Sequence, residues 1–201
     1  MEKNKVKDLT QGNVFKLILG FSIPLLFGML FQQFYSMVDT IIVGKYLGVT
    51  ALAEVGSTGS ISFMIIGFCM GVCNGFAIPV AQKFGARNYK LLRKYVFNSA
   101  ILSAIFSIAM TIIVCLLCRK ILGWMNTPDD IMEGAYSYIF VIFLGIPVTY
   151  LYNLLAGIIR SFGDSKTPLI FLIMSSIINI VLDLAFIIIF KMGVAGAAWA
   201  T

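Results

Sequence analysis

Long apolar segments separated by short polar ones are the feature that most limits how this chain can fold. A helix needs about 20 consecutive apolar residues to cross the hydrocarbon core of a bilayer. Five segments reach that length, at about residues 14–43, 51–80, 95–117, 131–159 and 168–190. Hydrophobic residues make up 60% of the chain and charged residues 12%, which is more apolar than an average soluble domain. The sequence therefore predicts an all-α, polytopic bundle of transmembrane helices with the lipid bilayer as its solvent.

A sixth apolar segment begins at residue 194 and runs to Thr201. It is shorter than one crossing, and free backbone groups cannot stop in lipid without hydrogen-bond partners. We expect it to be the incomplete start of a sixth helix in a longer protein. The predicted organisation is a short N-terminal segment, 1–13, followed by one transmembrane bundle, 14–201.

Basic residues alternate between the polar connections. Most of the 15 Lys and Arg residues lie before the first helix or in every second connection: Lys3, Lys5, Lys7, Lys16, Lys83, Arg87, Lys90, Arg93, Lys94, Arg160 and Lys166. The other connections hold Lys45, Arg119, Lys120 and Lys191, together with Glu54, Asp129, Asp130 and Glu133. This asymmetry predicts a multi-pass protein of the plasma (inner) membrane with a cytoplasmic N-terminus. Basic and aromatic residues do not share one solvated surface, so nucleic acid is not an expected partner.

Two aspartates, Asp39 and Asp183, lie inside the apolar segments. A charge at the centre of a spanning helix costs about 2.5–3.5 kcal/mol on insertion scales, whereas each Leu, Ile or Phe returns only about 0.3–0.6 kcal/mol. Acids in such positions face the bundle interior or a water-filled cavity and usually have a function. We therefore expect these two aspartates to form the functional site.

Each aspartate has polar neighbours at helical spacing: Gln32 and Ser36 with Asp39, and Ser176 and Asn179 with Asp183. If the two polar stripes face each other, every group in the site carries oxygen. Such ligands suit a hard cation such as Na⁺. They equally suit protons, because desolvation and a neighbouring like charge both favour the protonated acid. A purely structural polar clamp between helices is the alternative.

Other residues that could carry chemistry have simpler interpretations. Histidine is absent and the four cysteines lie in apolar helices, so no Cys/His zinc site is expected and the cysteines are interpreted as small buried apolar residues. Gly67, Gly71 and Gly75 form a stripe on which a neighbouring helix can pack closely. Pro24 and Pro147 lie within predicted helices and are candidate hinges.

Three motifs in order resemble the N-terminal half of multidrug and toxic compound extrusion (MATE) transporters. The first helix and its end resemble the family's first-helix pattern at residues 24–26, 34–40 and 44–48. The connections at residues 81–88 and 160–168 are similar to those after the family's second and fourth helices. One departure is Ser161, where members often carry Gly. The resemblance implies one lobe of a two-lobe, twelve-helix antiporter that exports drugs or organic cations in exchange for Na⁺ or H⁺, without enzymatic activity and without a resident cofactor.

The resemblance also assigns roles to residues of this chain. The family's cation site uses acids and polar groups of the first, fifth and sixth helices, which correspond here to Asp39, Asn179, Asp183 and Thr201. A tyrosine of the fourth helix belongs near it, and Tyr138 is favoured over Tyr136. Pro24 matches a proline associated with bending of the first helix. The partners implied are the missing C-terminal lobe and small, cationic organic substrates.

Three other functions compete with this one. A lipid-linked oligosaccharide flippase of the same superfamily would need basic rather than acidic cavity residues for an anionic headgroup. An intramembrane aspartyl protease would need Tyr-Asp and Gly-x-Gly-Asp motifs, but Asp39 follows Val38 and Asp183 follows Leu182. A membrane fragment that does not transport is the third.

Overall fold

The computed structural model describes residues 12–201, which are helical apart from short connections. The elements are α1 (Val14–Gly85), α2 (Tyr89–Trp124), α3 (Asp129–Leu144), α4 (Ile146–Ser161), α5 (Lys166–Leu184), the π-helix η1 (Ala185–Ile189) and α6 (Gly193–Ala200). No strand occurs within residues 12–201, and the all-α class is confirmed. The predicted N-terminal segment, 1–13, lies almost wholly outside the described residues.

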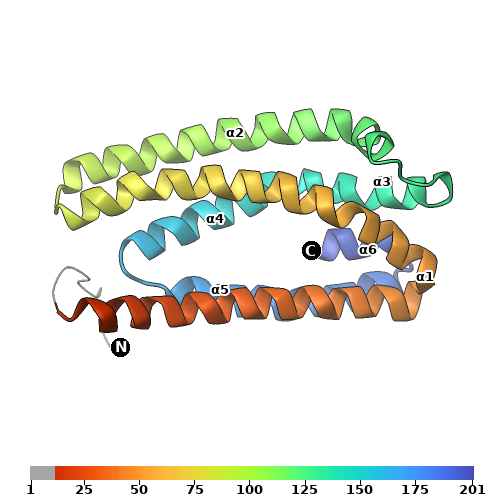
Figure 1. Cartoon of the computed structure of the whole chain (residues 1–201), viewed down its shortest axis with the longest axis horizontal. Helices are drawn as coiled ribbons and strands as arrows, with labels where there is room; N and C mark the ends of the chain where they lie inside the picture. Colours follow the sequence, from red (N-terminus) through yellow and green to blue (C-terminus); the bar gives the residue numbers. More distant parts are fainter. Residues whose placement is uncertain (1–11) are drawn as a thin grey trace.

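The element α1 contains two membrane-spanning helices joined at Gly48. The sequence predicts a turn over residues 44–50, but the helix is interrupted only at Gly48, whose φ of 90° and ψ of −174° are non-helical. A positive φ of this kind is open to glycine because it has no Cβ. Confining the break to one residue keeps the neighbouring backbone groups hydrogen-bonded, as a membrane setting requires. The chain folds back at this point (Figure 1).

The fourth predicted helix is divided in the structure. The sequence predicts one helix over 131–159, but α3 and α4 meet at Gly145 with a bend of 42°. Pro147 follows the bend and has no backbone N–H, so the carbonyl of Phe143 loses the hydrogen bond that a continuous helix would give it. Taken together, the two helices are long and apolar enough to cross a membrane.

The remaining helices differ from prediction at their ends. The apolar stretch at 95–117 lies within the longer α2, which begins after Asn88, whose side chain caps the helix by accepting from the amide of Leu91. The segment predicted at 168–190 is α5 followed by the π-helical turn η1. The short α6 follows where the sequence places the start of a sixth helix.

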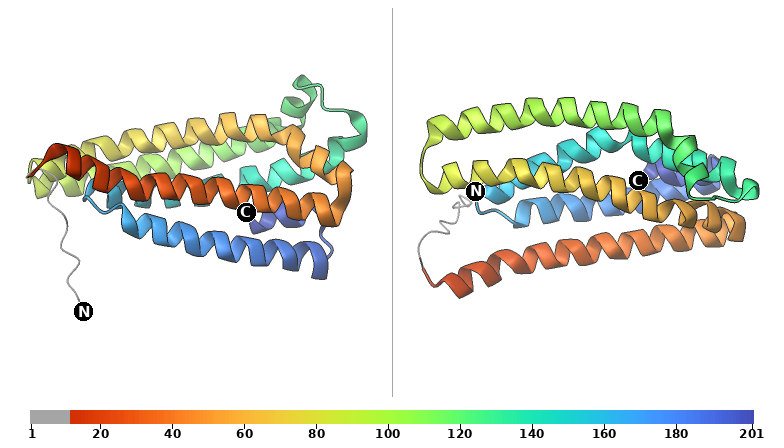
Figure 2. Two further views of the ribbon diagram at one scale, coloured as in Figure 1. Left: turned by 60° about the horizontal axis from the view of Figure 1, so that its bottom comes forward. Right: turned by 45° about the horizontal axis from the view of Figure 1, so that its top comes forward.

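The helices pack in two layers. The first half of α1 lies alongside α5, and the second half of α1 packs with α2, α3 and α4 (Figure 1). In the right-hand view of Figure 2, the first half of α1 lies on the side of the bundle away from α2. An apolar core joins the helices of the larger layer, with Phe143, Ile139 and Leu122 fully buried in it. A second core near Gly48 links α1, α3, η1 and α6.

The stripe of Gly67, Gly71 and Gly75 does not pack as predicted. All three glycines are exposed, and no atom lies within 4 Å of the position that a Cβ would take at any of them. The prediction of close helix packing on this face is therefore wrong for the described residues. A period of four residues marks a smooth face but does not specify which helix covers it.

Candidate functional site

The two intramembrane aspartates meet between α1 and α5. Asp39 is only 7% exposed, and Asp183, near the end of α5, is completely buried. Because the first half of α1 packs along α5, the two carboxyl groups come within direct interaction range of each other. Two acids that the sequence separates by most of the chain thus form one site.

Several oxygen atoms in this site have no hydrogen-bond donor. They are Oδ1 of Asp39, both carboxyl oxygens of Asp183 and the side-chain oxygen of Asn179, which have no partner among the described residues. Buried polar atoms are nearly always paired, because an unmade hydrogen bond costs about 1–3 kcal/mol. Unpaired acceptors on two interacting carboxyl groups are therefore suited to receive a proton or a hard cation.

Asn179 extends the site toward the C-terminal end of the chain. Its side-chain nitrogen lies 3.5 Å from the hydroxyl oxygen of Thr201, to which it donates. Thr201 in turn donates to the carbonyl of Ala197 at 3.0 Å. Ser176 is buried on the same helix, but its hydroxyl donates to the carbonyl of Leu172 at 2.8 Å. The structure thus places Thr201 beside Asn179, while the hydroxyl of Ser176 bonds to its own helix.

Two tyrosines border the acids. Tyr138 is 9% exposed and lies within electrostatic range of Asp39, Asp183 and Tyr35. Tyr35 is half-buried and within range of the same two acids. The sequence predicts Tyr138 here but misses Tyr35, although Tyr35 lies one helical turn before Asp39, where i and i+4 side chains are neighbours. Tyr136, the other candidate, stacks on Phe140 instead.

The other predicted members of the site lie at its edge or away from it. Gln32 and Ser36 are exposed, and Gln32 interacts with Tyr35 rather than with an acid. In the first half of α1, the side that faces α5 is covered by other helices. Gln32 and Ser36 lie outside that covered side. Pro24 is half-buried, and α1 stays helical there, since Gly48 is its one non-helical residue.

We call Tyr35, Asp39, Tyr138, Asn179 and Asp183 the acidic cluster. Within residues 12–201 no group of three or more His, Cys, Asp or Glu side chains could hold a metal ion. Two carboxyl groups with an amide and hydroxyls make a weaker, all-oxygen set. Such a set fits a proton or a monovalent hard cation that must bind and leave, and it does not fit a tightly held transition metal.

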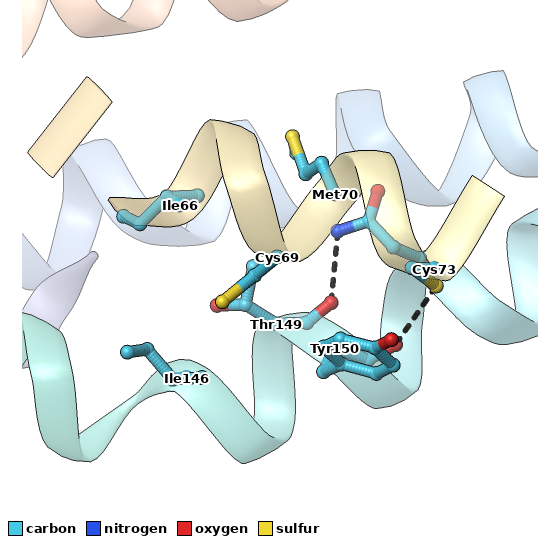
Figure 3. A pocket seen from close by; sticks show the side chains of 8 residues that line it. Ile66, Cys69, Met70, Cys73, Ile146, Thr149 and Tyr150 are labelled. Atoms are coloured by element: carbon cyan, nitrogen blue, oxygen red, sulfur yellow. Dashed lines mark hydrogen bonds between the residues drawn. The ribbon is translucent and has the colours of Figure 1, made fainter. Parts of the chain in front are cut away.

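A second buried polar region lies between the second half of α1, α2 and α4. A cavity of about 10 Å³ is lined there by Ile66, Cys69, Met70, Cys73, Ile146, Thr149, Tyr150 and Asn153 (Figure 3). The thiol of Cys73 donates to the carbonyl of Tyr150 at 3.8 Å. The hydroxyls of Tyr150 and of Ser103 on α2 have no partner among the described residues by ordinary geometry. We call Cys69, Cys73, Ser103 and Tyr150 the neutral cluster.

Comparison with known proteins gives consistent matches. The MatE family model matches residues 24–185. A relative named "Probable multidrug resistance protein YpnP", from Bacillus subtilis, is 32% identical over 197 residues, which cover 98% of this chain and 44% of the relative. The chain therefore spans about half the length of the curated relatives it matches.

Solved structures share the fold. The chain superposes on an outward-facing multidrug resistance MATE transporter of the MOP superfamily with a TM-score of 0.90 and 31% identity, covering 100% of this chain and 44% of the other. A MOP superfamily transporter from Pyrococcus furiosus, described as having a binding pocket of reverse polarity, gives the same TM-score and identity.

Proposed function

This chain belongs to the MatE family of membrane transporters, and from that premise we propose that it is the ion-coupling half of a secondary active antiporter. The antiporter exports drugs or organic cations and takes up Na⁺ or H⁺ in exchange. Members of this family are transporters, not enzymes, and relatives of this chain carry multidrug resistance names.

The observation that carries the proposal is the convergence of Asp39 and Asp183 with unpaired carboxyl oxygens. A clamp between helices needs only neutral hydrogen-bonding groups, and Asn or Ser would serve at lower cost in lipid. A pair of acids can instead exist with or without a proton or Na⁺ between them. Because each state carries a different charge, each can favour a different conformation.

In the proposed cycle, the acidic cluster binds the coupling ion in one conformation and releases it in the other. Asp39 and Asp183 supply the negative charge, Asn179 supplies a carbonyl oxygen, and Tyr138 and Tyr35 close the site with their hydroxyl groups. The organic cation favours the conformation without the coupling ion, since both reduce the same negative charge. Pro24 is the proposed hinge of the first half of α1.

The proposed orientation follows the distribution of charge over the two ends of the bundle. The connections at 85–89 and 161–166 lie at one end, whereas Gly48 and the connections at 124–129 and 189–193 lie at the other (Figure 1). Basic residues gather at the first end and acidic residues at the second. We therefore propose that the first end faces the cytoplasm and that the protein resides in the plasma membrane. A second lobe is the proposed partner that completes the transport path.

A flippase for lipid-linked oligosaccharides is the weaker candidate. Its anionic substrate would be bound by cavity lysines or arginines, whereas the buried charged residues among residues 12–201 are Asp39 and Asp183. The same polarity favours a cationic substrate for the proposed antiporter.

The proposal is tested by transport in the intact protein, reconstituted into liposomes with an imposed Na⁺ or pH gradient. Asp39→Asn and Asp183→Asn should each insert normally and lose gradient-driven uptake of a fluorescent organic cation. The matched control is Glu133→Gln, an acid on the exposed surface that pairs with Arg119 and should transport as the wild type does. Undiminished, gradient-dependent transport by both aspartate variants would refute the proposal.

A further inference from the structure

A concentrated basic surface lies at the turn between α1 and α2. It comprises Lys83 in the last turn of α1 and Lys90, Arg93 and Lys94 near the start of α2. We call these four residues the inner basic patch. The three residues of α2 are exposed and Lys83 is half-buried. Their spacing of i, i+3 and i+4 puts Lys90, Arg93 and Lys94 on one face of α2.

The turn that presents these side chains is held by its own hydrogen bonds. The amide of Asn88 donates to the carbonyl of Lys83 at 3.0 Å, and the amide of Arg87 donates to that of Phe84 at 2.9 Å. The side chain of Asn88 then caps α2 by accepting from the amide of Leu91 at 3.2 Å. The basic side chains therefore project from a fixed backbone.

Within the described residues, the stretch of α1 and α2 that carries the patch contains no acid, and Asp164, in the connection before α5, accepts hydrogen bonds from Lys166 and Thr167. No Asp or Glu occurs anywhere in residues 55–128, and the first turn of α2 contains no acid. Lys90 and Lys94 repel each other at i, i+4 spacing, and positive charge at a helix N-terminus opposes the helix dipole. Among residues 12–201 the recorded ion pair joins Arg119 and Glu133, at the other end of the bundle. An anion from outside the chain would relieve both the repulsion between Lys90 and Lys94 and the unfavourable interaction of their charges with the helix dipole.

Aromatic residues place the patch at the membrane surface. Tyr89 and Tyr95 flank it and are 56% and 38% exposed, and Tyr is enriched at the level of lipid headgroups. The ammonium of Lys83 lies 5.9 Å from the centre of the Tyr95 ring, so this lysine reaches across to α2. The apolar part of α2 begins directly after Tyr95. We propose that the inner basic patch binds the phosphate groups of anionic phospholipids.

The opposite end of α2 provides a natural contrast. Arg119 and Lys120 are also adjacent to the membrane-spanning part of α2, but Arg119 pairs with Glu133 and lies over the ring of Tyr136. Its charge is therefore satisfied within the chain. Arg119 and Lys120 therefore serve as a matched control for removing positive charge from the same helix.

The direct test is lipid binding by the purified protein in detergent, measured by native mass spectrometry. Phosphatidylglycerol and phosphatidylcholine are titrated against the wild type and the variant K90Q/R93Q/K94Q. We expect the wild type to prefer phosphatidylglycerol, and each removed charge to weaken that binding about fivefold. The control R119Q/K120Q should bind as the wild type does.

A charge-preserving variant and a competition experiment serve as further controls. The variant K90R/K94R preserves charge and should keep the preference for phosphatidylglycerol, which separates a loss of charge from a loss of folding. Inorganic phosphate at equal concentration should not compete with the lipid. Equal binding of the two lipids, unchanged binding by the triple glutamine variant, or full competition by inorganic phosphate would each overturn the proposal.

Discussion

The acidic cluster and the neutral cluster are both buried polar regions of one small bundle, but they differ in what their groups can become. In the neutral cluster, Tyr150 and Ser103 keep neutral hydroxyls, and Cys73 bonds to a backbone carbonyl. In the acidic cluster, Asp39 and Asp183 can change charge. The comparison indicates that buried polar groups between these helices can be neutral, as the bond from the Cys73 thiol to the Tyr150 carbonyl shows, so the two carboxyl groups need another explanation.

The packing around each cluster supports this difference. The neutral cluster lies within the larger apolar core, whose cavity of about 10 Å³ has space for about one water molecule. The acidic cluster lies between the two layers, where the first half of α1 has α5 as its main neighbour (Figure 1). Tyr138 of the acidic cluster also belongs to the second, smaller core near Gly48, so the two clusters are held by different apolar cores.

The strongest way to break the comparison is to replace Asp183 with a residue that lipid tolerates. In the intact protein, Asp183→Leu should abolish cation-driven transport while the thermal stability stays the same or rises, because replacing a buried charged group by an apolar one is often neutral or stabilising. The control Tyr150→Phe should retain most of the transport. Transport and unfolding temperature are measured on the same preparations.

A loss of stability in Asp183→Leu comparable to that of a core truncation would support the structural clamp instead. The acids would then hold the helices together, and the distinction between the two clusters would fail.

The larger core is tested by Phe143→Ala. Phe143 is completely buried, and truncation of a buried Phe typically costs about 3–5 kcal/mol through lost contacts and a residual cavity. The free energy of unfolding in sodium dodecyl sulfate should fall by about that amount. Phe63→Ala, at a position that is 83% exposed, should change it little. Equal effects of the two substitutions would contradict the assignment of the core.

Asp164 shows what a structural carboxylate looks like in this chain. It lies in the connection before α5, where it accepts from the amides of Lys166 and Thr167, each at 3.0 Å, and from the hydroxyl of Thr167 at 2.6 Å. Burial alone would raise the pKa of Asp164, but these hydrogen bonds and the charge of Lys166 hold the pKa below its ordinary value. Asp164→Ala should therefore lower the free energy of unfolding by about 1 kcal/mol, the usual effect of losing a helix cap.

The contribution of Asp164 should depend on pH in one direction. Because its folded pKa is below the unfolded value of about 3.9, its stabilisation is complete above that pH and declines as the pH falls through the folded pKa. The difference in unfolding free energy between the wild type and Asp164→Ala should shrink in acid. A difference that grows on acidification would contradict this assignment.

Tyr138 borders the two aspartates of the acidic cluster. Removing its hydroxyl in Tyr138→Phe takes one potential hydrogen bond from the coupling ion or the acids, and we expect transport to fall by about threefold to tenfold. Tyr136→Phe, which alters a ring stacked on Phe140, should leave transport unchanged. Equal losses in the two variants would remove Tyr138 from the site.

The sequence predicts the existence of the site better than its membership. The cost of an acid in lipid singles out Asp39 and Asp183, and it requires them to face other protein groups rather than lipid. It does not specify which arc of each helix is covered. The structure therefore leaves Gln32 and Ser36 exposed, although they share a polar stripe with Asp39, and it adds Tyr35.

The sequence also predicts the helix boundaries only in part. Apolar length predicts the crossings, but the bend at Gly145 and the π-helical turn η1 after α5 depend on local hydrogen bonding. Pro147 marks the bend only approximately, because the backbone can adjust at any residue in the preceding turn. The sequence contains no comparable signal for η1.

The central claim is that the two aspartates bind and release a transported cation. Infrared difference spectroscopy of the purified protein tests it directly, because a protonated carboxylic acid in an apolar site has its own carbonyl band. We predict a band that disappears when the pH is raised or when Na⁺ is added, and that is absent from the double variant D39N/D183N. A band that persists in the wild type under both treatments, over the range in which transport depends on the cation, would show that the acids form a permanent clamp.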